Sequence, residues 1–250
     1  CEPHSAAQRR VARQGIERAG VHGSCPGPDR TSACIGGCAI NLMIVSHLHS
    51  FIFVAVPKTG THSVRQALRA HMGPDDMEQA RLFVEKQFPI PELAQLGHGH
   101  LSFQDVRPHL GEEAFASYFK FAFVRNPFDR FISYCSFATS REGTFERDPK
   151  RVMRHFLFTA PPHNHIIFKP QFTFLCGPDG QLQADYLGKV ESMQASYHEV
   201  AQRLGIETTP LDRANRSRRG NYKDYYDQEL IDGVARIYAR DLELFGYDYW

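Results

Sequence analysis

A strand–loop–helix pattern that occurs twice limits the fold of this chain more than any other feature. In the first copy, an aromatic and β-branched run, Phe51–Val56, leads into the turn Pro57–Thr61 and then into helical spacing. In the second copy, Tyr118–Val124 leads into Arg125-Asn-Pro and a second helix. Short, continuous apolar runs are typical of strands buried on both faces of a parallel sheet. Each copy therefore predicts one βα unit.

Two later segments extend this pattern. Ala184–Val190 predicts a third strand, followed by a helix that Ser192 caps and Gly205 ends. A last helix is expected between Asp227 and Gly246. The alternation predicts a three-layer α/β fold, with a mostly parallel central sheet covered by helices on both faces. Ligands of such sheets bind at the carboxyl ends of the strands, which is where both turns lie.

The first 42 residues differ from the rest of the chain. They hold four of the six cysteines and show no sustained apolar periodicity. We expect residues 1–42 to be a disordered or adventitious leader and residues 43–250 to form a single domain. Met43 then fits a natural start, because strand-like sequence follows it directly.

The composition limits the location and the partners. No run approaches the ~20 apolar residues of a membrane span, and residues 1–41 lack the apolar core of a signal peptide. Only Cys135 and Cys176 follow the leader, which favours a cytoplasmic location over a membrane-associated or Golgi-like one. The net charge of +1 gives no global attraction for nucleic acid, so any anion site must be local.

The first turn carries the groups that a phosphate needs. Gly60 lets the backbone approach closely, and the amides that begin the next helix point outward at its positive end. Thr61 and Ser63 add hydroxyl donors, and Lys58 adds a positive charge. The pattern GxxxxGK[ST] of a Walker A loop is absent. The alternative is an ordinary βα turn with a solvated lysine.

The second turn carries a second set of anion-binding groups. Arg125 directly follows a buried strand, and Ser133 lies eight residues further along the helix. A guanidinium can donate two parallel hydrogen bonds to a phosphate, and a serine hydroxyl can donate a third. The alternatives are an ion pair of Arg125 with Asp129 and a surface position for Ser133. Two such turns in one chain favour a pair of anion sites.

At these residues the chain resembles the sulfotransferases. Phe53–Ser63 (FVAVPKTGTHS) is similar to their 5′-phosphosulfate loop, and Phe123–Ser133 (FVRNPFDRFIS) is similar to their 3′-phosphate motif. The likeness covers Met43–Trp250 and is to the family-2 carbohydrate sulfotransferases, which include uronyl 2-O-sulfotransferases and bacterial relatives. It implies a P-loop-like architecture and the sulfuryl donor 3′-phosphoadenosine-5′-phosphosulfate (PAPS), with adenosine 3′,5′-bisphosphate as product. It assigns the 5′ end to Lys58, Thr59, Gly60, Thr61, His62 and Ser63, and the 3′-phosphate to Arg125 and Ser133.

Further segments resemble motifs of the same family. Gly97–Phe103 (GHGHLSF) is similar to a GHxxF segment whose histidine is the base, and the aligned residue is His100, with His98 as the alternative. Asn215–Tyr222 (NRSRRGNY) resembles a late basic loop that closes over the nucleotide, which implies roles for Arg218 and Arg219. A solvated basic loop is the alternative. Lys169–Leu175 and Asp185–Glu191 also fit family patterns.

The resemblance predicts transfer of a sulfuryl group from PAPS to an acceptor hydroxyl on a carbohydrate. His100 would take the hydroxyl proton, and Lys58 would stabilise charge on the leaving oxygen. The rivals are a P-loop nucleotide kinase or hydrolase, which needs a Walker lysine and a Mg²⁺-binding acid, and a non-catalytic nucleotide-binding protein. The sequence leaves the acceptor and the oligomeric state open.

No metal is expected. His-x-His pairs occur at His98/His100 and at His163/His165, and Cys34 and Cys38 have a CxxxC spacing. None of these has a third ligand marked nearby in the sequence.

Overall fold

The computed structural model describes residues 43–79, 90–96, 98–211 and 220–250. They all fall within one compact unit, Cys38–Trp250. The predicted leader lies outside the described residues, as do Arg218 and Arg219. The division into a leader and a single domain therefore stays a prediction.

The described residues form one sheet of five strands, in the order β3-β1-β2-β4-β5. The strands are β1 (Met43–Ser46), β2 (Phe51–Val54), β3 (Met77–Gln79), β4 (Phe119–Val124) and β5 (Tyr186–Lys189). The three predicted strands are confirmed as β2, β4 and β5, which pair in parallel. Their carboxyl ends therefore lie at one edge of the sheet.

The prediction of a mostly parallel sheet is wrong for half of it. Strand β1 pairs antiparallel with both β2 and β3, so two of the four pairings are antiparallel. Only His47–Ser50 separate β1 from β2. A connection this short makes a hairpin, whereas a parallel pair needs a crossover of about a dozen residues or more.

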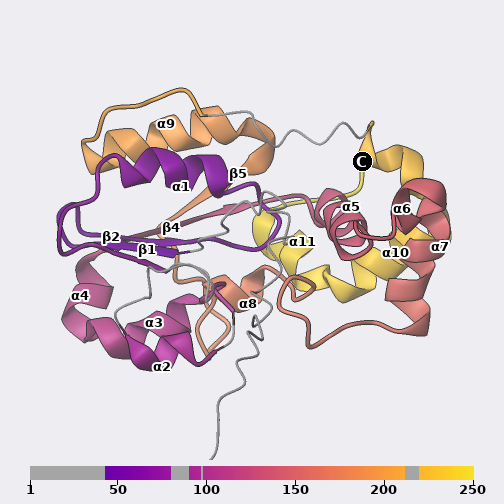
Figure 1. Cartoon of the computed structure of the whole chain (residues 1–250), viewed down its shortest axis with the longest axis horizontal. Coiled ribbons are helices and arrows are strands. Elements are labelled where there is room, and N and C mark those ends of the chain that lie inside the picture. The colour runs from indigo at the N-terminus through magenta and orange to yellow at the C-terminus, as the bar shows by residue number, and fades with distance from the viewer. Residues whose placement is uncertain (1–42, 80–89, 97, 212–219) are drawn as a thin grey trace, which may run out of the picture. The chain divides into compact units, whose positions relative to one another are not determined.

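Helices cover both faces of the sheet, as predicted (Figure 1). Helices α1 and α9 lie on one face, and α2, α3, α4 and α8 lie on the other. Neighbouring side chains of a strand point to opposite faces of the sheet. In β2, Phe53 therefore packs in the core beneath α1 and α9, and Val54 packs in the core on the α3 side. A third apolar cluster joins α5, α7 and α10. The helices are α1 (His62–Arg69), α2 (Pro91–Ala94), α3 (Phe103–Leu110), α4 (Glu112–Ser117), α5 (Pro127–Ala138), α6 (Thr144–Arg147), α7 (Pro149–Arg154), α8 (Phe172–Leu175), α9 (Met193–Leu204), α10 (Gln228–Ile237) and α11 (Ala239–Phe245).

The predicted end of α9 is confirmed, but its predicted cap is not. Gly205 ends the helix in the left-handed region, at φ 65°. The Ser192 side chain makes no capping hydrogen bond, because its ψ of 39° is not the extended conformation that a capping side chain needs. Nearby, the hydroxyl of Ser196 within α9 accepts from the backbone amide of Lys189 in β5 at 3.1 Å.

The predicted last helix is two helices, α10 and α11, separated at Tyr238. Asp227 caps the first by accepting from the Leu230 amide, and Gly246 ends the second at φ 63°. At this position the Tyr238 hydroxyl donates to the Phe168 carbonyl at 2.9 Å. That contact joins residues far apart in the chain, so it leaves no local sequence signal.

The described residues contain no helix long and apolar enough to cross a membrane. In the same ranges Cys135 and Cys176 are buried thiols that form no disulfide.

Candidate functional site

The turn after β2 has a constrained backbone at the carboxyl edge of the sheet. Lys58 and Gly60 both have positive φ, of 65° and 63°. Such a φ is uncommon for a lysine and is often found at functional sites. The buried Thr59 closes the turn by donating its hydroxyl hydrogen to the Val56 carbonyl at 2.8 Å.

Helix α1 begins directly after this turn. The first amides of a helix have no acceptor inside the helix, and they carry its positive dipole end. Thr61 is the N-cap residue, and its side chain makes no capping bond. The Ser63 hydroxyl lies 3.5 Å from the Gly60 carbonyl and 3.7 Å from the Met193 sulfur. This end of α1 therefore suits an anion.

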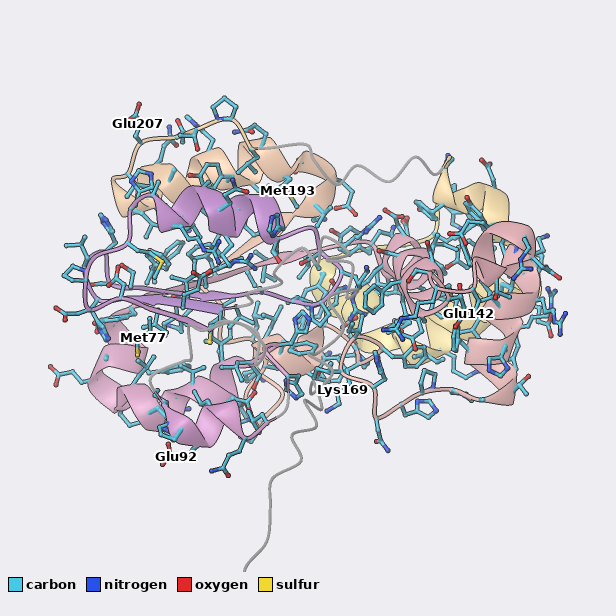
Figure 2. The ribbon with its side chains drawn as sticks, viewed as in Figure 1. Met77, Glu92, Glu142, Lys169, Met193 and Glu207 are labelled. Atoms are coloured by element: carbon cyan, nitrogen blue, oxygen red, sulfur yellow. The ribbon has the colours of Figure 1, made fainter. Side chains whose placement is uncertain are left out.

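Two further contacts shape the same helix end. Met193, at the start of α9, lies on the α1 side of the sheet (Figure 2). Its methyl carbon would lie 3.2 Å from a Cβ at Gly60, so a side chain there would be crowded as well as strained. His62 shares a 3.1 Å hydrogen bond with Arg65, which forms a 2.9 Å ion pair with Glu78.

The second corner follows β4. The Arg125 guanidinium forms an ion pair with Asp129, one turn into α5, with Nη2 2.7 Å from the carboxylate. This is the alternative that the sequence offered for Arg125. Ser133, one turn further along α5, is buried. Asp129 and Ser133 are spaced by four residues, so they lie on the same side of the helix.

The structure brings the two corners together. Arg125 Nη1 donates to the Lys58 carbonyl at 3.2 Å. Arg130, also on α5, donates through Nε to the Pro57 carbonyl at 2.9 Å. The Lys58 turn and the Arg125 turn therefore lie at one edge of the sheet and are in direct contact.

Sequence reasoning missed Arg130. Its side chain is 2% exposed and also donates to the Ile167 and Lys169 carbonyls, each at 2.9 Å. It thus joins the first corner to the segment before α8. The available signal was an arginine set among apolar residues, between Phe128 and the pair Phe131 and Ile132.

His100 lies beneath the same edge. Its Nδ1 is 3.1 Å from the carbonyl of Ala55, the residue that follows β2. A carbonyl only accepts, so Nδ1 carries the proton and Nε2 has the free lone pair. Burial lowers the pKa of His100 from 6.5 to about 4, and the positive charges of Arg130 and Lys58 add smaller lowering effects. His100 is therefore neutral at pH 7.

This lowered pKa predicts a pH-dependent stability. Between pH 6.5 and about 4 the unfolded chain binds the His100 proton and the folded chain does not. The free energy of unfolding should therefore fall as pH falls through this window, by about 3 kcal/mol in all. Urea unfolding at several pH values checks this. The slope should flatten in His100→Gln and persist in His109→Gln, at an exposed histidine; equal slopes in all three proteins would contradict it.

His98 remains the alternative base. Its Nδ1 is buried and has no hydrogen-bond partner within the described ranges. Burial lowers its pKa, and Lys169 adds to the lowering whereas Asp105 opposes it. Within the part of the chain that the structure describes, the two histidines thus differ in that only the tautomer of His100 is defined by a hydrogen bond, to the Ala55 carbonyl; which of them is the base stays a prediction.

The Lys58 side chain extends along α5. Its Nζ lies 4.4 Å from the centre of the Phe137 ring, a cation–π contact with a partly exposed aromatic residue. The ammonium also contributes to the lowered pKa of His100. The charge of Lys58 therefore acts at His100, the other predicted catalytic residue.

The described residues hold no cluster of three or more His, Cys, Asp or Glu that suits a metal; whether a metal takes part stays a prediction. A cavity of about 470 Å³ lies at α7 and the following turn, lined by Lys150, Arg151, Arg154, His155, Asp148 and Thr159. None of the predicted site residues lines it.

Comparison with known proteins gives one family. A model described as "Sulfotransferase family" matches residues 41–248. Carbohydrate sulfotransferase 10 of Xenopus laevis is 24% identical over 251 residues, which cover 83% of this chain and 68% of that protein. No solved structure matches the chain.

Proposed function

Because this chain belongs to the sulfotransferase family, we propose that it transfers a sulfuryl group from PAPS to an acceptor hydroxyl on a carbohydrate. In this proposal the first βα unit acts like a P-loop: the turn after β2 and the start of α1 bind the donor's 5′ phosphosulfate. The likeness to a carbohydrate sulfotransferase supports the acceptor class.

The observation that carries this proposal is the hydrogen bond between Arg125 and the Lys58 carbonyl. PAPS has anionic groups at the 3′ and 5′ positions of one ribose, so its enzyme needs two anion sites close to one another. A turn with outward amides and a lysine beside a turn with an arginine meets that need.

Each predicted residue has a role in this arrangement. Lys58, Thr59, Gly60, Thr61, His62 and Ser63 form the 5′ site, and Arg125 and Ser133 form the 3′ site. Arg125 now bonds to Asp129, so the 3′-phosphate would have to share the guanidinium with that carboxylate. Arg218 and Arg219 would close over the nucleotide, and they lie outside the described residues.

The proposed chemistry uses two groups, the His100 imidazole and the Lys58 ammonium. His100 Nε2 takes the proton of the acceptor hydroxyl as its oxygen bonds to sulfur. The bond between sulfur and the bridging oxygen breaks, and the Lys58 ammonium stabilises the negative charge that this oxygen gains. A pKa of about 4 makes His100 a weak base in the free protein. A bound anion next to it raises that pKa toward the useful range.

The 3′ site gives a direct test of the donor. Adenosine 3′,5′-bisphosphate should bind about 10- to 100-fold more tightly than adenosine 5′-phosphate, because a charge-assisted contact contributes about 1.5–3 kcal/mol. Titration calorimetry measures both affinities. Arg125→Ala should remove most of the difference. Arg203→Ala should keep it, because Arg203 forms a similar i,i+4 ion pair, with Glu199 on α9.

A turnover assay separates the rival functions. Labelled sulfate should pass from PAPS to at least one member of a glycan panel, and ATP with Mg²⁺ should not be consumed. Nucleotide binding without transfer to glycans, lipids or phenols would favour a non-catalytic protein. ATP hydrolysis would favour a P-loop enzyme. The cytoplasmic location remains a prediction.

A further inference from the structure

The buried side chain of Gln171 holds the backbone of Arg125 at two points. Gln171 is 0% exposed. Its Oε1 accepts from the Arg125 amide at 3.0 Å, and its Nε2 donates to the Arg125 carbonyl at 2.9 Å. One side-chain amide therefore satisfies both polar groups of the Arg125 backbone.

These bonds lie where the sheet ends. The last pairing of β4 joins Val124 to Lys189 of β5. Arg125 is the next residue, so its amide and carbonyl have no strand to pair with, and Gln171 takes the place of that strand. The following amide, of Asn126, donates to the Glu191 carboxylate at 2.8 Å. Side chains from distant segments thus hold this corner.

Gln171 is itself held in place by Asp241 of α11. Asp241 is 0% exposed. Its carboxylate accepts from the backbone amide of Gln171 at 2.7 Å and from the backbone amide of Phe172 at 2.8 Å. Two residues earlier, the Lys169 carbonyl accepts from Arg130, which also bonds to Pro57. The segment from Lys169 to Gln171 therefore contacts the Arg125 corner directly and the Lys58 corner through Arg130.

We infer that Gln171 is a positioning residue for the donor's 3′ site: it sets the direction in which the Arg125 guanidinium leaves the sheet edge. This inference rests on the proposed function, because it assigns a 3′-phosphate to that guanidinium. Without Gln171 the amide and the carbonyl of Arg125 would both lose their hydrogen-bond partner. The backbone that carries the guanidinium would then no longer be held in one position. The effect should be larger for the 3′-phosphate than for the 5′ end, since among the described residues the Gln171 side chain bonds to Arg125 and Asp241 and reaches the 5′ turn only through Arg125.

The test compares two affinities in one variant. Gln171→Met keeps an unbranched side chain of similar length but cannot form the two hydrogen bonds. The preference for adenosine 3′,5′-bisphosphate over adenosine 5′-phosphate should fall about tenfold, as expected for the loss of buried hydrogen bonds. The affinity for adenosine 5′-phosphate should change much less. Hydrogen exchange at the Arg125 amide should become faster. If the methionine variant does not fold, Gln171→Asn, whose shorter amide cannot reach both groups, is measured instead.

A control for general destabilisation is Val200→Ala, a buried truncation on α9. It should lower the melting temperature while leaving the preference unchanged. An unchanged preference in a folded Gln171 variant would overturn the inference and leave the proposed function standing. Equal affinities of the unsubstituted protein for the two nucleotides would overturn both.

Discussion

Replacing His100 by alanine should lower kcat by about 100- to 10,000-fold, the usual contribution of a positioned general base. The affinity for adenosine 3′,5′-bisphosphate should stay nearly unchanged, because His100 lies below the turn and bonds to Ala55, not to a predicted phosphate ligand. A transfer assay with labelled PAPS and the best acceptor from the panel measures kcat, and calorimetry measures the affinity.

Two further variants make this result interpretable. His100→Asn retains a donor for the Ala55 carbonyl, so it separates loss of the base from loss of the fold, and it should be as inactive as the alanine variant. His98→Ala should keep most of the activity. If His98→Ala were inactive and His100→Ala active, His98 would be the base. The alignment of the GHxxF motif with His100 would then be wrong.

Replacing Lys58 by alanine should lower kcat by about 100- to 1000-fold, since one charge-directed donor commonly contributes ~3–4 kcal/mol in a site that excludes water. The positive φ of residue 58 adds no new strain, because alanine and lysine both have a Cβ. The variant should therefore fold, and its thermal unfolding should resemble that of the unsubstituted protein.

The comparison that isolates the charge uses two more lysine variants. Lys58→Met keeps most of the aliphatic side chain and loses the ammonium, so it should match the alanine variant. Lys150→Ala removes an exposed lysine of α7 whose ion pair with Asp227 spans 3.5 Å, and it should retain full turnover. Near-normal kcat in Lys58→Met would remove Lys58 from the mechanism.

Local sequence patterns were sufficient for the parts of the site that follow strands. The runs Phe51–Val56 and Tyr118–Val124 predicted β2 and β4, and parallel strands place the turns after them at one edge. The contact between Arg125 and Lys58 is the consequence of that geometry. The family motifs also predicted His100, which the structure buries against the Ala55 carbonyl; its role as the base stays a prediction.

Contacts between distant segments could not be predicted in the same way. The antiparallel half of the sheet depends on a hairpin between β1 and β2 and on the return of β3 beside β1. Tyr238, where the last helix is interrupted, bonds through its hydroxyl to Phe168, 70 residues away. Neither feature leaves a pattern of apolar and polar residues within a single segment.

The sequence by itself determined the βα units, the order of the two turns predicted to bind anions and the residue types available at each. Only the tertiary structure decided that Arg125 pairs with Asp129, that Arg130 bonds to Pro57, and that Gln171 and Asp241 hold the second turn. The physical reason is that buried polar groups must find partners wherever the fold brings them. Such partners are chosen by proximity in space, which neither composition nor spacing along the chain records.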